Sequence, residues 1–572
     1  MESWPSRAPA DPREADDTVQ AEPATLPATA ADAHVDADTI AHTNADGGAA
    51  TDKDTGSRRP GAAARFLRHP AVILAVVALV AGVPRFWALG DPGTDHGHRV
   101  YVFDETYYAK DACLYAGNAP QQCDLTTTSE EQSWVHPPLG KWMIALGIKL
   151  FGYNAIGYRF SSALFGTASV VITAAIALLL FGSVGWTYVA GLLLATESLN
   201  FVQSRVALLD IFVAFWVVLG FLFVVLDRRS IERRTGAQHP ADRRLGPMQE
   251  PDPPPELGPG TVITAERAPS VQLLSRRVPS PLWRPWRLAA GLAFGAGIAT
   301  KWNGLPPLLG AIGLVFAWEW LRRRRGAVRA PLWATVRQEG LTIFVSLALL
   351  PLLVYIGSYS GRIEPSPFPR ERYVPGAGWH FSLPQLWELQ GEMAHFHETL
   401  YAIDPTTHKP AHPYESRPWS WLYLGRPVAY YYVGPGSEIL GIGNPAIFWF
   451  NLLAIPWLAF AAWRRRDWVA AFILVAIAVQ YVPWFIPPAL NKVQFLFYAT
   501  PISPFLVLAA TYVVRDLATM RVAGSRSRPF LPLAVGFVAA SVGLFVFFWP
   551  ILNAYPLSHA AWSARMWFRS WI

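Results

Sequence analysis

The sequence predicts an all-α protein that crosses a membrane many times, with about eleven transmembrane helices and two substantial loops on the outer side. The chain has 572 residues, of which 52% are hydrophobic and 16% are charged, whereas a soluble domain carries about 25% charged residues. Its mean hydropathy is positive, at +0.23, and apolar runs recur along its length. These observations exclude an ordinary soluble enzyme, and the presence of only two cysteines excludes a disulfide-rich scaffold.

The first 65 residues differ in kind from the rest of the chain. They hold twelve Asp and Glu against six Lys and Arg, a net charge of −6, which leaves +13 on the remainder of a chain whose total is +7. Large apolar side chains are almost absent, so this segment cannot offset the entropy cost of ordering. We expect a disordered, acidic, cytoplasmic tail over residues 1–65 and a membrane domain over residues 66–572.

The transmembrane prediction rests on apolar segments that approach the roughly 20 residues a bilayer requires. The candidate segments are 70–89, 159–181, 185–203, 206–226, 287–302, 304–321, 340–358, 443–462, 468–487, 494–514 and 530–549. Basic residues indicate the orientation, because cytoplasmic loops are enriched in Lys and Arg. With a cytoplasmic N-terminus, the basic clusters at 322–325, 464–466 and 515–528 and the eleven arginines within 227–287 all fall on the cytoplasmic side.

This orientation separates the loops into two groups. The segment 227–287, rich in Pro and Arg, is expected to be a flexible cytoplasmic loop. The outer loops 90–158 and 359–442 hold most of the histidines and the clusters of aromatic and acidic residues, so we expect an extracytoplasmic active site on a protein of the cell membrane. The basic residues of the chain are not accompanied by a motif that recognises nucleobases, so nucleic acid is not an expected partner.

The first outer loop supplies two adjacent carboxylates, Asp104 and Glu105, soon after the first apolar segment. A carboxylate can accept the proton of a hydroxyl that attacks an anomeric carbon, although a solvated loop start or a helix cap would look the same. Cys113 and Cys123 lie in the same loop; they either form a disulfide or remain free thiols, and the outer location favours the disulfide.

Further along this loop, His136 and Lys141 flank two prolines that precede an amphipathic stretch, 139–151. We expect this stretch to lie in the membrane interface. Both side chains could then contact an anionic head group or line a cleft for the substrates; a rigid loop with an interfacial anchor is the alternative.

Three cations are candidates for binding a phosphate at the outer face. Arg159 opens the second apolar segment, and a guanidinium presents the forked donors that suit a phosphate. Arg205 stands at another outer boundary, where a structural ion pair with Asp210 is equally compatible with the sequence. Lys301 lies between two apolar segments, a position typical of a functional charge, or of a turn.

The large outer loop supplies further candidates for a substrate cleft, because aromatic and imidazole side chains beside carboxylates suit a sugar. These are His397, His412, Tyr414, Trp421 and Arg426. The histidines complete neither an HExxH motif nor a closed zinc set. We therefore expect no metal and no cofactor.

Taken in order, these segments resemble the protein O-mannosyltransferases in their actinobacterial form. The resemblance covers about residues 65–572 and rests on short motifs: Phe103-Asp104-Glu105, His136-Pro137-Pro138-Leu139-Gly140-Lys141, Gly157-Tyr158-Arg159, Arg205 to Asp210, and His412-Pro413-Tyr414 with Trp419-Ser420-Trp421. It implies a GT-C glycosyltransferase fold. It also implies transfer of mannose, with inversion, from polyprenyl-phosphate mannose in the outer leaflet to Ser or Thr of an exported polypeptide, beside the protein-export machinery.

The resemblance also implies roles for individual residues. Asp104 and Glu105 correspond to the essential acidic pair, with Asp104 the candidate base, and Arg159 corresponds to a critical arginine. On chemical grounds Arg159, with Lys301 or Arg205, would stabilise the charge that grows on the donor phosphate, and Glu105 would pair with Arg159. The loop 359–442 is too short for the MIR domain that eukaryotic members insert, so recognition by such a domain is not expected.

Two other functions remain compatible with the sequence. One is a polytopic transporter or lipid flippase, which the lack of an obvious internal repeat disfavours. The other is a GT-C transferase whose acceptor is a lipid or a glycan, because no residue visibly recognises a peptide.

Overall fold

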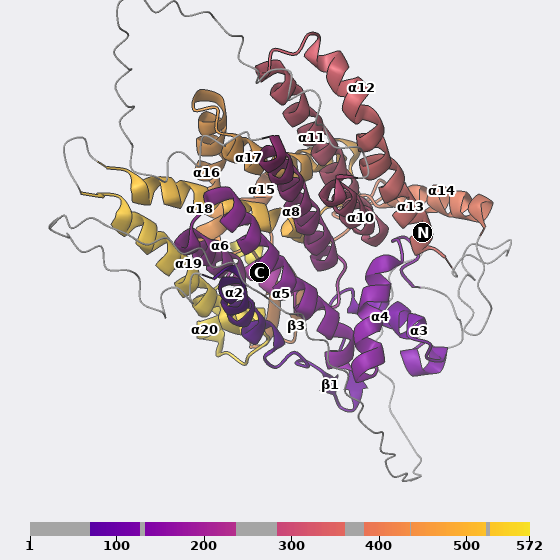
Figure 1. Ribbon diagram of the computed structural model, residues 1–572. Coiled ribbons are helices and arrows are strands. Elements are labelled where there is room, and N and C mark those ends of the chain that lie inside the picture. Colours follow the sequence, from indigo (N-terminus) through magenta and orange to yellow (C-terminus); the bar gives the residue numbers. More distant parts are fainter. Residues whose placement is uncertain (1–68, 126–131, 236–282, 361–381, 435, 522–526) are drawn as a thin grey trace, which may run out of the picture. The chain divides into compact units, whose positions relative to one another are not determined.

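The computed structural model describes residues 69–125, 132–235, 283–360, 382–434, 436–521 and 527–572, and most of them are helical (Figure 1). The expected acidic tail, 1–65, lies outside these residues. The apolar segments form the helices α2 (Pro70–Phe86), α5 (Ala155–Phe181), α6 (Val184–Ala195), α7 (Ser198–Gln203), α8 (Asp210–Thr235), α10 (Pro285–Thr300), α11 (Leu305–Arg325), α12 (Pro331–Phe344), α13 (Leu350–Ser358), α16 (Pro445–Arg464), α17 (Trp468–Tyr481), α18 (Ser503–Thr519) and α19 (Leu531–Leu552).

Each of the predicted apolar segments coincides with at least one of these helices. Within the described residues, eight helical stretches are long and apolar enough to cross a membrane. Outside these eight stretches, the apolar helices α2 and α6 have 17 and 12 residues, and α10 has 16. A multi-pass membrane protein is therefore confirmed, whereas the count of eleven spans is not.

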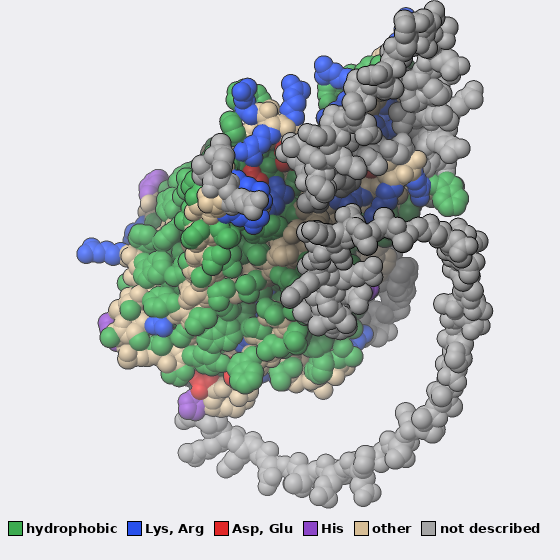
Figure 2. Space-filling view, turned by 60° about the vertical axis from the view of Figure 1, so that its left-hand side comes forward, with side chains coloured by type: hydrophobic (Ala, Val, Ile, Leu, Met, Phe, Trp, Pro, Cys, Tyr) green, Lys and Arg blue, Asp and Glu red, His purple; other side chains and the backbone are tan. Residues whose placement is uncertain are grey.

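Burial distinguishes central spans from peripheral ones. In the stretch Leu496–Thr519, 94% of an apolar 18-residue window is buried, and in α8 72%, whereas in α19 only 22% is buried. Large apolar side chains on the peripheral helices are exposed, and Figure 2 shows one such apolar face, with Lys and Arg side chains concentrated toward its upper end. An apolar exterior of this kind is what a helix bundle presents to lipid.

The loops predicted to be on the outer side contain short regular elements. The first loop holds β1 (Thr94–Asp95), β2 (His98–Arg99), α3 (Glu105–Tyr115) and α4 (Leu139–Phe151). The large loop holds α14 (Leu383–Thr399), α15 (Pro418–Trp421) and an antiparallel hairpin of β3 (Val428–Tyr432) and β4 (Glu438–Gly441), with an irregular register between Ala429 and Tyr431. The short helix α20 (His559–Ser563) follows α19. Single 3-10 turns are η1 (Pro120–Cys123), η4 (Trp302–Gly304), η6 (Val482–Phe485), η7 (Pro487–Leu490), η8 (Leu496–Ile502) and η9 (Arg569–Trp571).

The predicted loop 227–287 is wrong at both ends. Helix α8 continues to Thr235, and α10 begins at Pro285. The remainder of the predicted loop, 236–282, lies outside the described residues. At this boundary Asp227 of α8 accepts hydrogen bonds from Arg284 and Arg287 at the start of α10.

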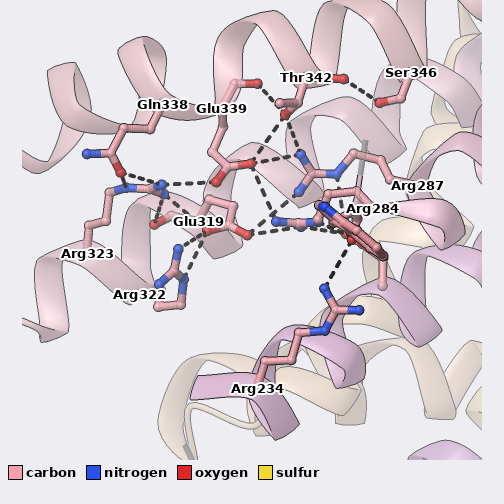
Figure 3. A network of polar contacts seen from close by, with 12 residues as sticks. Arg234, Arg284, Arg287, Glu319, Arg322, Arg323, Gln338, Glu339, Thr342 and Ser346 are labelled. Carbon is pink, nitrogen blue, oxygen red and sulfur yellow. Dashed lines mark hydrogen bonds and ion pairs between the residues drawn. The ribbon is translucent and has the colours of Figure 1, made fainter. Parts of the chain in front are cut away.

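These partners form a buried polar network that joins α8, α10, α11 and α12 (Figure 3). Arg284 makes a bidentate contact with Asp227, at 2.8 and 2.7 Å, and Arg287 donates to Glu339 at 2.9 Å. Arg323 donates to the other oxygen of Glu339 at 3.0 Å. Part of the basic cluster that indicated a cytoplasmic loop is therefore internal to the helix bundle.

Close packing of α10 against the next long helix depends on a glycine. A Cβ at Gly291 would lie 1.8 Å from the carbonyl oxygen of Ser346. Ser346 belongs to a π-helical turn, Val345–Leu349, which joins α12 to α13 without a break. The absence of a side chain at residue 291 therefore lets two backbones meet.

We predict that Gly291→Ala destabilises the protein, because the added methyl group must displace the backbone at Ser346. Overpacking of this kind costs about 1–3 kcal/mol. The matched control is Gly313→Ala in α11, where a Cβ meets nothing within 4 Å. Thermal unfolding in detergent should show a lower Tm for the first variant and an unchanged or higher Tm for the second. Equal Tm values for the two variants would contradict the packing described.

Candidate active site

A sharp turn at Phe103 precedes the two adjacent carboxylates, Asp104 and Glu105, and their side chains enter different environments. Phe103 has a φ of +52°, a left-handed conformation that costs a bulky residue about 1–3 kcal/mol. Its ring lies 5.0 Å from that of Tyr430, in a stacked arrangement, and 5.7 Å from that of Phe497. After this turn Asp104 is partly exposed, whereas Glu105 is fully buried.

Glu105 forms a buried, bidentate ion pair with Arg159 of α5. Both hydrogen bonds, Nε to Oε1 and Nη2 to Oε2, are 2.8 Å long, and neither side chain is exposed. Glu105 also accepts from the backbone N–H groups of Val102, at 2.8 Å, and Ala207, at 2.9 Å. The remaining nitrogen of Arg159, Nη1, donates to the carbonyl oxygens of Leu89, Asp91 and Pro92.

The geometry of this pair confirms one expectation and revises two. Glu105 and Arg159 do pair, as the sequence suggested. However, Glu105 is buried and surrounded by donors, so it is not placed to act as a base. All the nitrogens of the Arg159 guanidinium face protein oxygens, so we no longer assign Arg159 to the donor phosphate. Both residues instead hold α3, and with it Asp104, against α5.

A second ion pair lies where two membrane helices meet. Lys301 ends α10, and its Nζ is 2.9 Å from Oδ2 and 3.1 Å from Oδ1 of Asp210, the first residue of α8. The ion pair of Arg205 with Asp210, one of the two alternatives that the sequence left open, is therefore not formed. Arg205 is buried and donates to the backbone carbonyls at the end of α2, those of Pro84, Arg85, Trp87 and Ala88. It stabilises that helix terminus and is not available to a phosphate.

Aromatic rings surround the Lys301 ammonium group and the two nearby aspartates. The Nζ atom of Lys301 lies 4.8 Å from the ring centroid of Tyr498 and 5.7 Å from that of Phe497. Burial raises the pKa of Tyr108 and of Tyr430, and the charges of Asp104 and Asp210 raise both further, which places these rings beside the carboxylates. Tyr430 and Tyr498 could not be predicted as site residues, because nothing in their local sequence distinguishes them from core aromatics.

Asp104 has the ionisation behaviour of a base that works near neutrality. Burial raises the pKa of its carboxyl to about 7; Lys301 opposes this shift, and the negative charge of Asp210 adds to it. A carboxyl group with a pKa near 7 is partly ionised at neutral pH. Its ionised form is basic enough to accept and hold a proton. Asp104 is thus the group best placed for proton transfer.

Two histidines from different loops lie together within the electrostatic influence of Lys301. The rings of His136 and His397 are 5.7 Å apart, and His397 stacks on Trp302 at 5.6 Å. Burial lowers the pKa of both imidazoles, and the charge of Lys301 lowers both further. Both histidines are therefore neutral at pH 7. The structure thus brings Asp104, Lys301, His136 and His397 into one site.

Three of the residues predicted to line the cleft have structural contacts instead. Lys141 is fully buried, where its Nζ donates to the carbonyls of Ser133 and His136 at 2.8 and 3.1 Å, 3.9 Å from Asp111; it does not reach a head group. Trp421 is only 1% exposed and belongs to the apolar core. Arg426 donates to the carbonyl of Pro413 and to those of Ser570 and Ile572.

His412 and Tyr414 lie next to the site rather than in it. The Nδ1 of His412 accepts from the backbone N–H of Tyr414, at 3.2 Å. The ring of His412 contacts Phe495 at 4.8 Å, and Phe495 stacks on Phe497 at 5.3 Å. Any effect of these two residues on the site therefore passes through Phe495 and Phe497.

The structure pairs Cys113 with Cys123, with Cα atoms 5.6 Å apart, as expected for the outer loop. This disulfide joins the end of α3 to the turn that follows it. Among the described residues, no group of three or more His, Cys, Asp or Glu is arranged to hold a metal ion.

Comparison with known structures and sequences identifies the fold and then the family. The chain resembles the S. cerevisiae protein O-mannosyltransferase Pmt1–Pmt2 complex bound to the sugar donor, with a TM-score of 0.62 at 14% identity, covering 90% of this chain and 94% of that one. Its fold is that of the GT-C membrane glycosyltransferases. A family model described as the C-terminal four TMM region of protein-O-mannosyltransferase matches residues 382–571, and one described as dolichyl-phosphate-mannose-protein mannosyltransferase matches residues 135–232.

Curated relatives extend the match to nearly the whole chain. A polyprenol-phosphate-mannose–protein mannosyltransferase of Mycobacterium tuberculosis (strain CDC 1551) is 30% identical over 87% of this chain and 91% of its own length. One of Mycolicibacterium smegmatis (strain mc(2)155) is 32% identical over 87% and 92%. The chain belongs to the protein O-mannosyltransferase family. It is therefore an enzyme of the glycosyltransferase class, which supports the transferase interpretation over a transporter.

We predict that Glu105→Gln destabilises the protein strongly, because it leaves the buried Arg159 charge without a counter-charge. Removing one partner of a buried pair costs about 3–5 kcal/mol. The matched control is Asp124→Asn, which removes the partner of Arg99 from a pair whose side chains are 33% and 37% exposed. Exposed pairs contribute about 0–1 kcal/mol. Thermal unfolding should separate the two variants, and a Glu105→Gln variant as stable as the control would argue against the role given to this pair.

Proposed function

We propose that this enzyme transfers mannose from polyprenyl-phosphate mannose to Ser and Thr hydroxyls of polypeptides. The observation that carries the proposal is the Asp104 carboxyl, whose pKa burial raises to about 7, together with the Lys301 ammonium group at the end of α10. This arrangement supports the proposal because a base and a cation at the ends of membrane helices suit a substrate whose phosphate is carried by a lipid. The names of the curated relatives supply the sugar, the lipid phosphate and the protein acceptor.

The reaction is a single displacement at the anomeric carbon. The acceptor oxygen forms a bond to this carbon while the bond to the phosphate oxygen breaks, so the configuration inverts. The hydroxyl proton passes to the Asp104 carboxylate, and the electron pair of the broken bond leaves on the polyprenyl phosphate. The single displacement needs no covalent enzyme intermediate and no cofactor.

The phosphate charge is assigned to Lys301 rather than to the arginines. Lys301 approaches the site from the end of α10, and Asp210 holds its ammonium group in place at 2.9 Å. The neutral imidazole of His136 can donate a hydrogen bond to the same phosphate, whereas the single N–H of neutral His397, at Nδ1, donates to the carbonyl oxygen of Met393 at 2.7 Å. Preorganised donors of this kind stabilise the charge that develops on a leaving group.

We propose that the site lies on the outer face of the cell membrane, with a cytoplasmic N-terminus. Helices α8 and α10 support this orientation. They carry Asp210 and Lys301 at one end and the arginine network of Asp227, Arg284 and Arg287 at the other (Figure 3). Cytoplasmic ends are the basic ones. The acceptor is then an exported polypeptide, which the protein-export machinery would deliver beside the outer loops.

Transfer can be tested directly with the full-length protein in detergent. Radiolabelled polyprenyl-phosphate mannose is supplied with a Thr-rich peptide, and wild type is compared with Asp104→Asn. We expect label on the peptide from wild type and a loss of about 10²–10⁴-fold in the variant, the contribution of a general base. Asp124→Asn, in the same loop, is the matched control and should retain activity. Label on an added lipid or glycan instead of the peptide would overturn the acceptor assignment.

We also predict a pH dependence that Asp210 controls. The wild-type rate should rise as the pH increases through about 7, because Asp104 accepts a proton only when ionised. Removing the negative charge of Asp210 lowers the pKa of Asp104, so in Asp210→Asn this limb should move to lower pH. The pH profile of kcat/KM gives the comparison, with Asp124→Asn expected to keep the wild-type limb. A limb at the same pH in Asp210→Asn would show that Asp104 is not the titrating base.

A further inference from the structure

Helix α14 lies across the end of α13 rather than in line with it (Figure 1). Its buried side, formed by Leu386, Leu389 and Met393, packs with Tyr359 into a small apolar cluster separate from the main core. Tyr355 of α13 donates to Gln390 of α14, and Tyr359 donates to the sulfur of Met393 at 3.7 Å. The helix is thus attached to the end of a membrane span and crosses it.

The exposed side of α14 has an apolar edge and a polar edge. Leu383 and Trp387, one turn apart, are 58% and 81% exposed, and Trp387 is the most exposed large apolar side chain in the described chain. Glu388 and His395, two turns apart, are also exposed. Successive residues on a helix are separated by about 100°, which places these two polar residues together on the adjoining edge. The helix therefore has three strips: one packed on protein, one exposed and apolar, and one exposed and polar.

The membrane span next to α14 indicates what surrounds the exposed apolar edge formed by Leu383 and Trp387. The continuous helix Pro331–Ser358, which carries α14 at its end, is only 28% buried. Leu352 and Leu353, close to that end, are 52% and 54% exposed, as expected for side chains that face lipid. An exposed Trp immediately beyond such a surface is at the level of the lipid head groups, where indole rings are enriched.

We propose that α14 is an interfacial helix whose Leu383–Trp387 edge is inserted into the head-group region of the bilayer on the side of the active site. Its polar edge, with Glu388, faces water. His397, near the other end of the same helix, contacts Trp302 and His136. The lipid surface therefore helps to set the position of a residue in the site. This proposal depends on the geometry of the helix and not on the transfer of mannose.

Site-directed spin labelling of the full chain in liposomes tests this placement. Both native cysteines are in the Cys113–Cys123 disulfide, so a single introduced cysteine provides the only free thiol. The variants are Trp387→Cys and, as the matched control on the adjoining edge, Glu388→Cys. Each is labelled with a nitroxide in vesicles of phosphatidylcholine and phosphatidylglycerol, and collisions with oxygen and with a water-soluble nickel chelate are compared.

We expect the ratio of oxygen to nickel collisions to be several-fold higher at residue 387 than at residue 388. Free access of nickel at both positions would place the edge in water and overturn the proposal. Exclusion of both reagents at residue 387 would show that protein covers it, which also overturns the proposal. If Trp387→Cys does not fold, Leu383→Cys on the same edge gives the same comparison with the same criteria.

Discussion

The buried ion pair of Glu105 and Arg159 joins the outer loop to the membrane helices, and the position of the candidate base depends on it. Glu105 accepts from Arg159 of α5 and from the backbone of Ala207, just before α8, so three segments meet at one carboxylate. A charge with no exposure is stable only when it is paired and hydrogen-bonded. Because Asp104 precedes Glu105 directly, the requirement to satisfy the buried carboxylate also fixes where the exposed one lies.

The turn at Phe103 explains why Asp104 and Glu105, which are adjacent in sequence, have such different environments. The φ of +52° at Phe103 turns the chain so that Glu105 enters the protein while Asp104 remains partly exposed. The ring of Phe103, held by Tyr430 and Phe497, stabilises this unfavourable conformation. The hairpin strand β3 and the start of the Leu496–Thr519 stretch thus contribute to the geometry of a residue more than 300 positions away in sequence.

The apolar segments could be predicted from the sequence because hydropathy is a local property, and residue type alone singled out Asp104 and Lys301 as candidates for the site. The partners of individual charges could not be predicted. The sequence left an ion pair of Arg205 with Asp210 open, but Arg205 caps α2 instead, and Asp210 pairs with Lys301, which is 91 residues away in sequence. Lys141 looked like a contact for a head group because it follows His136, yet it is buried against Asp111. Such choices depend on which donors and acceptors the tertiary fold brings together, and sequence spacing does not encode them.

Helices α8 and α10 are joined by ion pairs at both ends, Asp210 with Lys301 at one end and Asp227 with Arg284 and Arg287 at the other. Sliding one helix along the other, or tilting them apart, would break a buried charge pair at one end or the other. The two spans therefore behave as a rigid frame. With the site as proposed, a substrate that parted these two spans would break one of these buried ion pairs, so a route between them is disfavoured.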